Sequence, residues 1–196
     1  LATYYPKESY WLILLNRISG KPGFSSRLSV DVLRLRMHHN MLKKPTEYME
    51  LAQLVLRDGA AGEGVKIINR GYKEGILGVG PDAARHQRLK DLAEKNLAET
   101  KTKAAAQEAE LTKAGDKDGL VALGYALVQA GDTAKGLAMM EAAIKGGGLK
   151  RPDDAKLRLG QAYAAAGKKS QALSTFRSVG GKEGAADIAR YYAMSL

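Results

Sequence analysis

Apolar residues along the chain recur at the three- and four-residue spacing that is typical of amphipathic helices. Leu89, Leu92, Ala93 and Leu97 follow this spacing within 82–116, and a shorter amphipathic stretch occupies about 184–196. No segment alternates apolar and polar residues as a half-buried strand would. The pattern therefore predicts an all-α protein.

Glycines and prolines divide these helical stretches from one another. Glycine tolerates the left-handed conformation that ends many helices, and proline fits the first helical turn because its missing N–H would be unpaired there. The predicted helix ends carry Gly59, Gly131 and Gly167, and the predicted first turns carry Pro45, Pro81 and Pro152. The markers repeat with a period of about 36 residues, which predicts an array of similar units.

Side chains agree with this period. Small residues recur at one position of the unit, as Ala52, Gly124 and Gly160, each directly after a leucine. We interpret each unit as two antiparallel helices, in which the small residue lets the second helix approach closely. One such unit cannot bury its own apolar face, so neighbouring units must share a core.

The best-defined unit, 156–176, matches the tetratricopeptide repeat at Leu159, Gly160, Tyr163, Ala172 and Phe176, with Lys156 at the usual aromatic position. The stretches 120–140 and 48–68 match it less fully. The chain thus resembles the tetratricopeptide family, which implies an α-solenoid of stacked helix pairs. The expected units are 7–44, 45–80, a degenerate unit at 82–116, 117–151 and 153–181, followed by a capping helix at about 184–196.

The sequence does not determine how many helices the degenerate unit contains. Residues 101–111 are rich in alanine, glutamate and lysine, which are strong helix formers. The segment 82–116 is either one long helix or two helices that break near Thr100 to Thr102.

The resemblance also implies a binding role without catalysis. In the family, the first helix of each pair lines a concave groove that holds a peptide or an extended protein segment. The corresponding positions here are Leu12, Asn16, Met49, Gln53, Arg57, Val121, Tyr125, Gln129, Leu157 and Gln161. The lysines of the family's carboxylate clamp are replaced by Met49, Val121 and Leu157, so that clamp is absent. These three residues alternatively pack against the next repeat.

Charge is unevenly distributed. The formal net charge is +10, and residues 1–44 hold 8 lysines and arginines against 2 acids. A basic field of this kind attracts acidic partners, although a solvated basic face is the simpler interpretation. The basic patch comprises Arg27, Arg34, Arg36, Lys43 and Lys44. Binding of RNA or another polyanion by this surface is the alternative to peptide binding, and we rank nucleic acid below protein.

Other features of the sequence do not point to catalysis or to a bound metal. The chain has no cysteine, His38 and His39 are adjacent and diverge on a helix, and no apolar run is long enough to cross a bilayer. Glycines at 78–80 and 146–148 fit turns better than nucleotide loops. We therefore expect no enzyme activity, no cofactor and no metal site.

The beginning of the sequence suggests a piece of a longer array. Residues 1–6 resemble the tail of a preceding repeat, so Trp11 and Leu15 would lack upstream neighbours and favour self-association. The motifs at 5–11, 33–37, 76–80 and 187–190 resemble the C-terminal part of proteobacterial tetratricopeptide proteins that have no assigned activity. That resemblance implies a periplasmic location, with a cytoplasmic one as the alternative.

Overall fold

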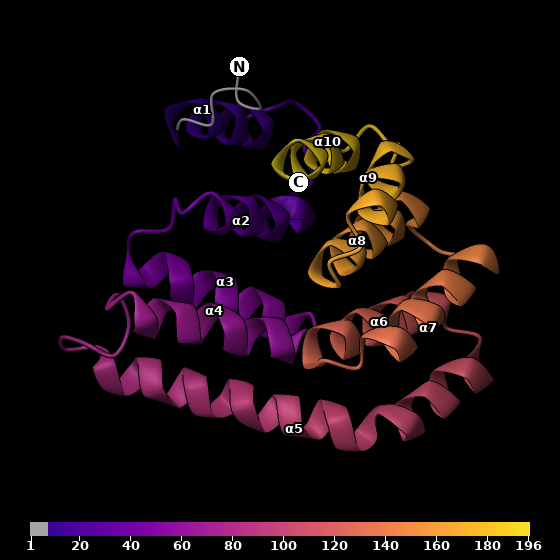
Figure 1. Cartoon of the computed structure of the whole chain (residues 1–196), viewed down its shortest axis with the longest axis horizontal. Coiled ribbons are helices and arrows are strands. Elements are labelled where there is room, and N and C mark those ends of the chain that lie inside the picture. The colour runs from indigo at the N-terminus through magenta and orange to yellow at the C-terminus, as the bar shows by residue number, and fades with distance from the viewer. Residues whose placement is uncertain (1–7) are drawn as a thin grey trace. The chain divides into compact units, whose positions relative to one another are not determined.

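The computed structural model describes residues 8–196, and every regular element in this range is a helix. Ten α-helices and one short 3-10 helix follow one another in these residues (Figure 1). The predicted all-α class is confirmed. Residues 1–7 lie outside the described residues, and with them the start of the 7–44 unit and the Tyr5-Pro6-Lys7 part of the predicted motif.

The chain divides into two compact units. The central unit is the continuous stretch 44–152, and the terminal unit combines residues 1–43 with residues 153–196. The first unit is therefore built from one segment of chain and the second from two segments that are far apart in sequence.

The central unit contains five helices in chain order. They are α3 (Pro45–Arg57), α4 (Ala61–Lys73), α5 (Ala83–Ala114), α6 (Lys117–Ala130) and α7 (Thr133–Lys145). Each helix packs on the next one, as in a stack of helix pairs. The start of α3 has the predicted proline at its first turn, and the Glu47 carboxylate accepts a hydrogen bond of 3.0 Å from the Lys44 backbone N–H.

Helix α5 settles the question left open by the sequence, because it is one helix of 32 residues. At the expected break, the Thr100 hydroxyl donates to the Asn96 carbonyl and the Thr102 hydroxyl donates to the Ala98 carbonyl, at 2.9 and 3.2 Å. These hydrogen bonds satisfy the two threonine hydroxyls within the helix, so the helix is not interrupted. It ends at Gly115, which has a positive φ of 66°.

The predicted role of small residues is visible where α6 crosses α7. A Cβ atom added to Gly124 would lie 2.6 Å from Met140 Cγ and 2.7 Å from the Gly136 carbonyl oxygen. The two backbones therefore touch at this crossing, and only glycine fits. Gly160 plays the same part in the terminal unit, where an added Cβ would lie 2.5 Å from the Phe176 ring.

The terminal unit contains α1 (Glu8–Ser19), η1 (Ser26–Leu28), α2 (Ser29–His38), α8 (Pro152–Ala165) from Asp153 onward, α9 (Lys169–Arg177) and α10 (Ala185–Ser195). Its two segments are joined directly. The Ser25 backbone N–H donates to the Glu183 carbonyl at 3.0 Å, and Arg27 Nε lies 2.6 Å from Asp154 Oδ2.

In a solenoid each repeat contacts only its neighbours. The early and late segments pair here instead, so the structure does not confirm a solenoid.

Trp11 and Leu15 are buried, with 2% and 0% of their surface exposed. The Trp11 ring stacks on His39 at 3.7 Å between centroids, and Tyr191 of α10 approaches it edge-on at 6.2 Å. The expectation that this apolar face is uncovered is therefore wrong, because α10 and the end of α2 cover it. The case for self-association through this face loses its basis.

Helix α10 corresponds to the predicted C-terminal cap. It packs against α9 and α2, and its Tyr192 ring stacks on Phe176 at 5.3 Å. Within the described residues, α10 thus contacts both segments of the terminal unit, the early one through α2 and the late one through α9.

Candidate functional site

The predicted groove positions do not form an accessible surface. Six of them are buried, and these are Met49, Val121, Tyr125, Gln129, Leu157 and Gln161. Asn16, Gln53 and Arg57 are exposed, as is Leu12. For Met49, Val121 and Leu157, burial agrees with the alternative that they pack within the protein and do not line a groove.

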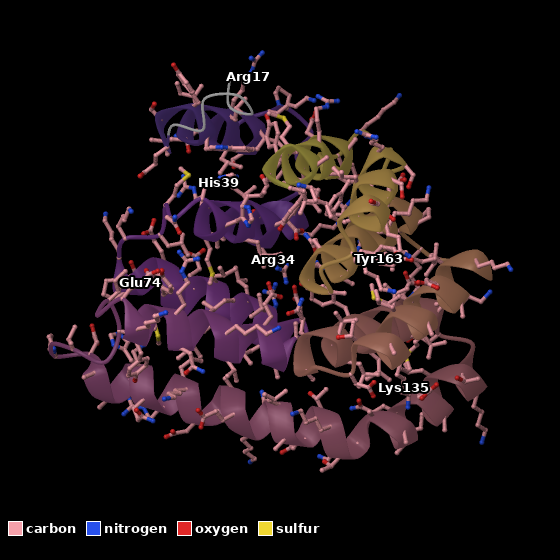
Figure 2. All side chains as sticks on the ribbon, viewed as in Figure 1. Arg17, Arg34, His39, Glu74, Lys135 and Tyr163 are labelled. Carbon is pink, nitrogen blue, oxygen red and sulfur yellow. The ribbon has the colours of Figure 1, made fainter. Side chains whose placement is uncertain are left out.

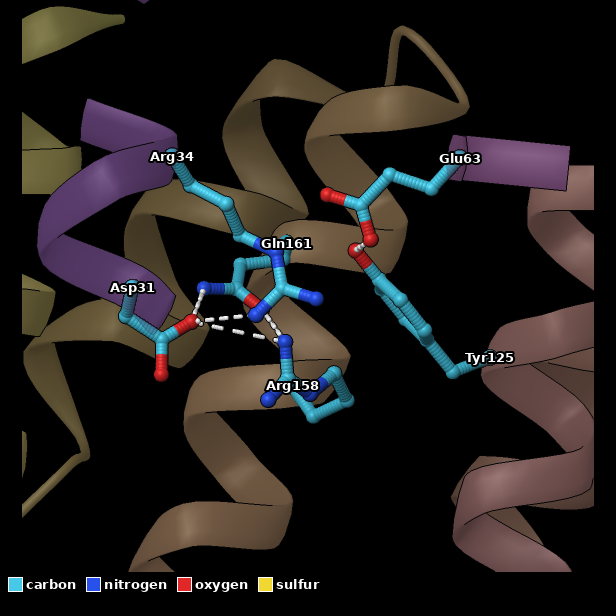
Figure 3. A network of polar contacts seen from close by, with 6 residues as sticks. All are labelled: Asp31, Arg34, Glu63, Tyr125, Arg158 and Gln161. Atoms are coloured by element: carbon cyan, nitrogen blue, oxygen red, sulfur yellow. Dashed lines mark hydrogen bonds and ion pairs between the residues drawn. The ribbon is translucent and has the colours of Figure 1, made fainter. Parts of the chain in front are cut away.

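In the central unit, the polar members of the set are satisfied by α4. The Tyr125 hydroxyl donates to Glu63 Oε2 at 3.2 Å (Figure 3), and Lys66 Nζ donates to Gln129 Oε1 at 3.1 Å. This face of α6 therefore packs against α4 and is not free to bind a peptide backbone.

In the terminal unit, Gln161 belongs to a buried charge network centred on Asp31 (Figure 3). Asp31 Oδ1 accepts hydrogen bonds from Gln161 Nε2 at 2.7 Å and from Arg34 Nη1 at 2.9 Å. Arg158 Nη1 lies 3.4 Å from the same oxygen and donates to Gln161 Oε1 at 2.7 Å. Three side chains thus converge on one carboxylate oxygen.

Burial of Asp31 disfavours its ionised form and by itself raises the pKa. The charges of Arg158 and Arg34, together with the hydrogen bonds from Gln161 and Arg34, outweigh burial and hold the pKa of Asp31 below its usual value. The carboxylate stays ionised at neutral pH. It serves as an internal partner of two arginines and has no free face for a reactant.

The predicted basic patch is largely used inside the terminal unit. Arg27 pairs with Asp154 and Glu183, at 2.6 and 2.7 Å, and Arg34 is buried against Asp31. Arg36 donates to Asn16 Oδ1 at 2.9 Å, and Lys44 is exposed. Lys43 is also exposed, and its side chain or backbone interacts with another group of the protein. Three of the five patch residues, Arg27, Arg34 and Arg36, are therefore engaged by partners within the terminal unit.

The central unit carries a solvent-accessible groove of about 500 Å³ that the sequence did not indicate. One wall is α5, with Thr100, Gln107, Glu110, Leu111 and Ala114, and the other is α6, with Gly119, Ala122, Leu123 and Ala126. The turn Asp58-Gly59 closes it at the end of α3. On each helix these residues are three, four or seven positions apart and so share a face.

The floor of the groove is the surface of a hydrophobic cluster. Leu123 belongs to a buried group with Ala104, Leu127 and Met139, and Leu111 packs against that group. Leu123 is 7% exposed and Ala126 is 6% exposed, whereas Ala122 is open to solvent. The floor is therefore fixed by core packing, and small side chains above it leave the groove open.

Both charged residues that line the groove are acids. Asp58 and Glu110 are exposed, and no lysine, arginine or histidine within residues 8–196 lines the groove. The exposed Arg57 side chain lies 3.6 Å from Asp58, which lines the groove. Arg57 is therefore a predicted site residue that contacts the groove lining. An apolar floor with an acidic rim favours a ligand that is both apolar and cationic.

The α5–α6 turn fixes the other end of the groove. The left-handed Gly115 ends α5, and the Asp116 side chain caps α6 by accepting from the Gly119 backbone N–H at 2.9 Å. Because both helix ends are anchored in one short turn, the two walls are preformed.

Metal-binding clusters and membrane-spanning helices are not found in the described residues. Within residues 8–196, no group of three or more His, Asp or Glu side chains is placed to hold a metal ion. None of the helices in the described range is at once long and apolar enough to span a bilayer.

Comparison of this chain with protein-family models, curated proteins and solved structures gave no match. The tetratricopeptide resemblance therefore stays a prediction.

Proposed function

We propose that this protein is a non-enzymatic binding module that holds a peptide segment of a partner protein in the groove between α5 and α6. The observation that carries the proposal is the open apolar floor formed by Leu111, Leu123 and Ala126, with acids at its rim. Its volume of about 500 Å³ lies within the range of roughly 300–1,000 Å³ that is usual for ligand pockets.

The two helical walls suit an amphipathic segment. Small residues at Gly119, Ala122 and Ala126 leave room for the apolar side chains of a partner, and Leu111 and Leu123 provide the contact surface. Burying those side chains would supply most of the binding free energy, since apolar burial contributes about 25 cal/mol per Å². This is the helix-in-groove mode, in which a few anchors at helical spacing carry recognition.

The acidic rim defines the charge of the partner. Lysine or arginine flanking the apolar anchors would pair with Asp58 and Glu110. Such rim charges mainly govern the association rate and the choice of partner. The proposed segment is therefore basic, in contrast to the acidic partner that the charge distribution alone suggested. The two acids also repel phosphate groups and so disfavour nucleic acid at this groove. The periplasmic location of the protein stays a prediction.

A peptide selection tests the proposal and does not require the partner to be identified first. The full chain would be screened against a random peptide library, and we expect enriched sequences with apolar anchors and at least one lysine or arginine. Ala122→Arg places a long cationic side chain in the groove and should weaken the enriched peptides by about tenfold or more. Binding would be measured by calorimetry on purified peptides.

Ala109→Arg is the matched control, because Ala109 is also exposed, lies on α5 and does not line the groove. It should leave binding unchanged. Enrichment of acidic peptides, or equal loss in both variants, would contradict the proposal. Preferential retention of nuclease-sensitive material by the chain would instead support the polyanion alternative.

A further inference from the structure

A second cavity, of about 560 Å³, lies in the terminal unit at the end of α1. It is bounded by the last turns of α1, by the Gly20 to Pro22 loop and by one face of α10. Leu14, Ile18 and Pro22 give it an apolar side. This cavity takes no part in the peptide groove, which belongs to the central unit.

Three cations from three separate elements line the cavity. Arg17 comes from α1, Lys21 from the loop and Arg190 from α10. Among the described residues, the single acid in the lining is Asp187, whose carboxylate lies 2.7 Å from Lys21 Nζ and 3.4 Å from Arg190 Nη1. The lining therefore keeps an excess of two positive charges.

Arg17 is the cation most available to a ligand. Its side chain is exposed, projects from α1 (Figure 2) and has no ion-pair or hydrogen-bond partner in the described part of the chain. Lys21 and Arg190 are held by Asp187 but keep further donors, because an ammonium has three N–H groups and a guanidinium has five. One anion could thus be bound by all three cations while Asp187 keeps Lys21 and Arg190 in place.

Tyr191 adds a hydroxyl to the same cavity. Burial and the nearby Asp187 carboxylate raise the pKa of Tyr191, and Arg190, Arg17 and Lys21 act against that rise. All three cations are thus close enough to act on this phenol. Because its pKa is raised, the hydroxyl stays protonated at neutral pH and can donate a hydrogen bond.

The carboxyl end of α1 opposes anion binding, since a helix C-terminus carries about half a negative charge. Two of its carbonyls are already used, because Asn16 O accepts from the Gly20 backbone N–H and Ile18 O accepts from the Lys21 backbone N–H, each at 3.1 Å. The half negative charge at the end of α1 is partly paired and is smaller than the two positive charges by which the lining is in excess, so it does not cancel them. The lining therefore keeps a net positive charge, which favours an anion over a cation.

We propose that this cavity binds a small organic phosphate monoester, with the phosphate held by Arg17, Lys21 and Arg190 and the organic part against Leu14, Ile18 and Pro22. A phosphate monoester carries about −1.5 to −2 charges at neutral pH, which matches the excess of the lining. Its oxygens can accept donors from several directions, as the three cations require. The apolar side favours an ester over inorganic phosphate.

Calorimetric titration of the full chain with phenyl phosphate at physiological ionic strength tests the proposal. We expect saturable binding that weakens about tenfold in Arg17→Gln and in Arg190→Gln, the usual cost of losing one charged hydrogen-bond donor. Arg88→Gln is the matched control, because Arg88 is exposed on α5 and lies outside the cavity. It should change the affinity by less than about twofold, since salt screens distant charges.

Arg17 has no ion-pair or hydrogen-bond partner among residues 8–196, so its variant is expected to fold, and circular dichroism would verify this. Absence of saturable binding by the unmodified chain would overturn the proposal. Equal losses in all three variants would overturn it as well, because they would indicate a diffuse charge effect. Inorganic phosphate that binds as tightly as phenyl phosphate would refute the role of the apolar side.

Discussion

The two units of this chain are held together by different kinds of interaction. In the central unit, consecutive helices pack closely, and backbones touch at Gly124 and Gly136. In the terminal unit, segments more than 100 residues apart are joined by ion pairs, by the Asp31 network and by rings around Trp11. One unit depends on shape between neighbours in sequence, and the other depends on charge and aromatic contacts between distant segments.

This difference affects what each unit tolerates. Close backbone contact fails when a side chain becomes larger, whereas a buried charge network fails when one charged member is removed. The single tryptophan, Trp11, lies in the terminal unit, so its fluorescence reports that unit, while far-UV circular dichroism reports helices throughout the chain. The two signals allow the units to be compared in one experiment.

The largest effect is expected for Asp31→Ala. The carboxylate is 1% exposed, and its loss leaves Arg34 and Arg158 without the charge on which they converge. Removing one member of a buried ion pair typically costs about 3–5 kcal/mol. We expect a loss of this size in the denaturant transition followed by Trp11 fluorescence at neutral pH.

Glu183→Ala is the control for that measurement, because Glu183 also belongs to the terminal unit. The Glu183 side chain is 64% exposed, and its pairing with Arg27 at 2.7 Å is a surface contact. Its removal should cost no more than about 1 kcal/mol. If both substitutions cost the same, the Asp31 network does not hold the terminal unit together.

Gly124→Val should have the next largest effect. The added side chain would meet the Gly136 carbonyl and Met140, neither of which can move without separating α6 from α7. Overpacking at such a contact costs about 1–3 kcal/mol. Ala122→Val introduces the same side chain at an exposed position of the same helix and should cost little.

The circular dichroism midpoint measures this loss, and Trp11 fluorescence measures how far it spreads. A fluorescence transition that stays in place would indicate that the units unfold separately. An equal shift of both signals would indicate one cooperative transition and would weaken the contrast between the units.

The helices and their crossings could be predicted from local sequence. The glycines at helix ends and at Gly124 and Gly160 act through conformation and size, and both properties belong to the residue itself. The Asp31 network could not be predicted, because Asp31 and Arg34 look like a solvated pair on one helix. Their partner Gln161 lies 130 residues further along the chain.

The groove could not be predicted for a related reason. The expected face of α6 lay at Val121 and Tyr125, but both are buried, as are most residues of this helix. Ala122 carries no polar or aromatic signal, and it lines a groove only because α5 continues without a break past Thr102. Helical periodicity shows which residues share a face, but it does not show which face a neighbouring helix leaves open.

A smaller effect, dependent on pH, is expected from His39. Burial and the neighbouring His38 lower the pKa of His39 to about 4 from an ordinary 6.5. Between these values the unfolded chain takes up a proton that the folded chain does not, so stability should fall as pH falls from about 6.5 to about 4. Solvent screens a half-buried ring, so we expect a loss of about 1 kcal/mol.

His39→Gln should abolish this pH dependence, and denaturant transitions at several pH values, followed by Trp11 fluorescence, would measure it. The indole stacks on His39, so the readout lies at the titrating group itself. A dependence that persists in the variant would assign the titration to another group.

The smallest effect is expected for Lys135→Gln in the central unit. Lys135 Nζ lies 2.8 Å from Glu108 Oε2, a distance close to those in the Asp31 network, but both side chains are about 40% exposed. Water and salt then replace the lost partner, so we expect no resolvable change in the circular dichroism midpoint. A loss as large as that of Asp31→Ala would show that ion-pair distance decides stability regardless of burial. It would also show that the central unit depends on charge as much as the terminal unit does.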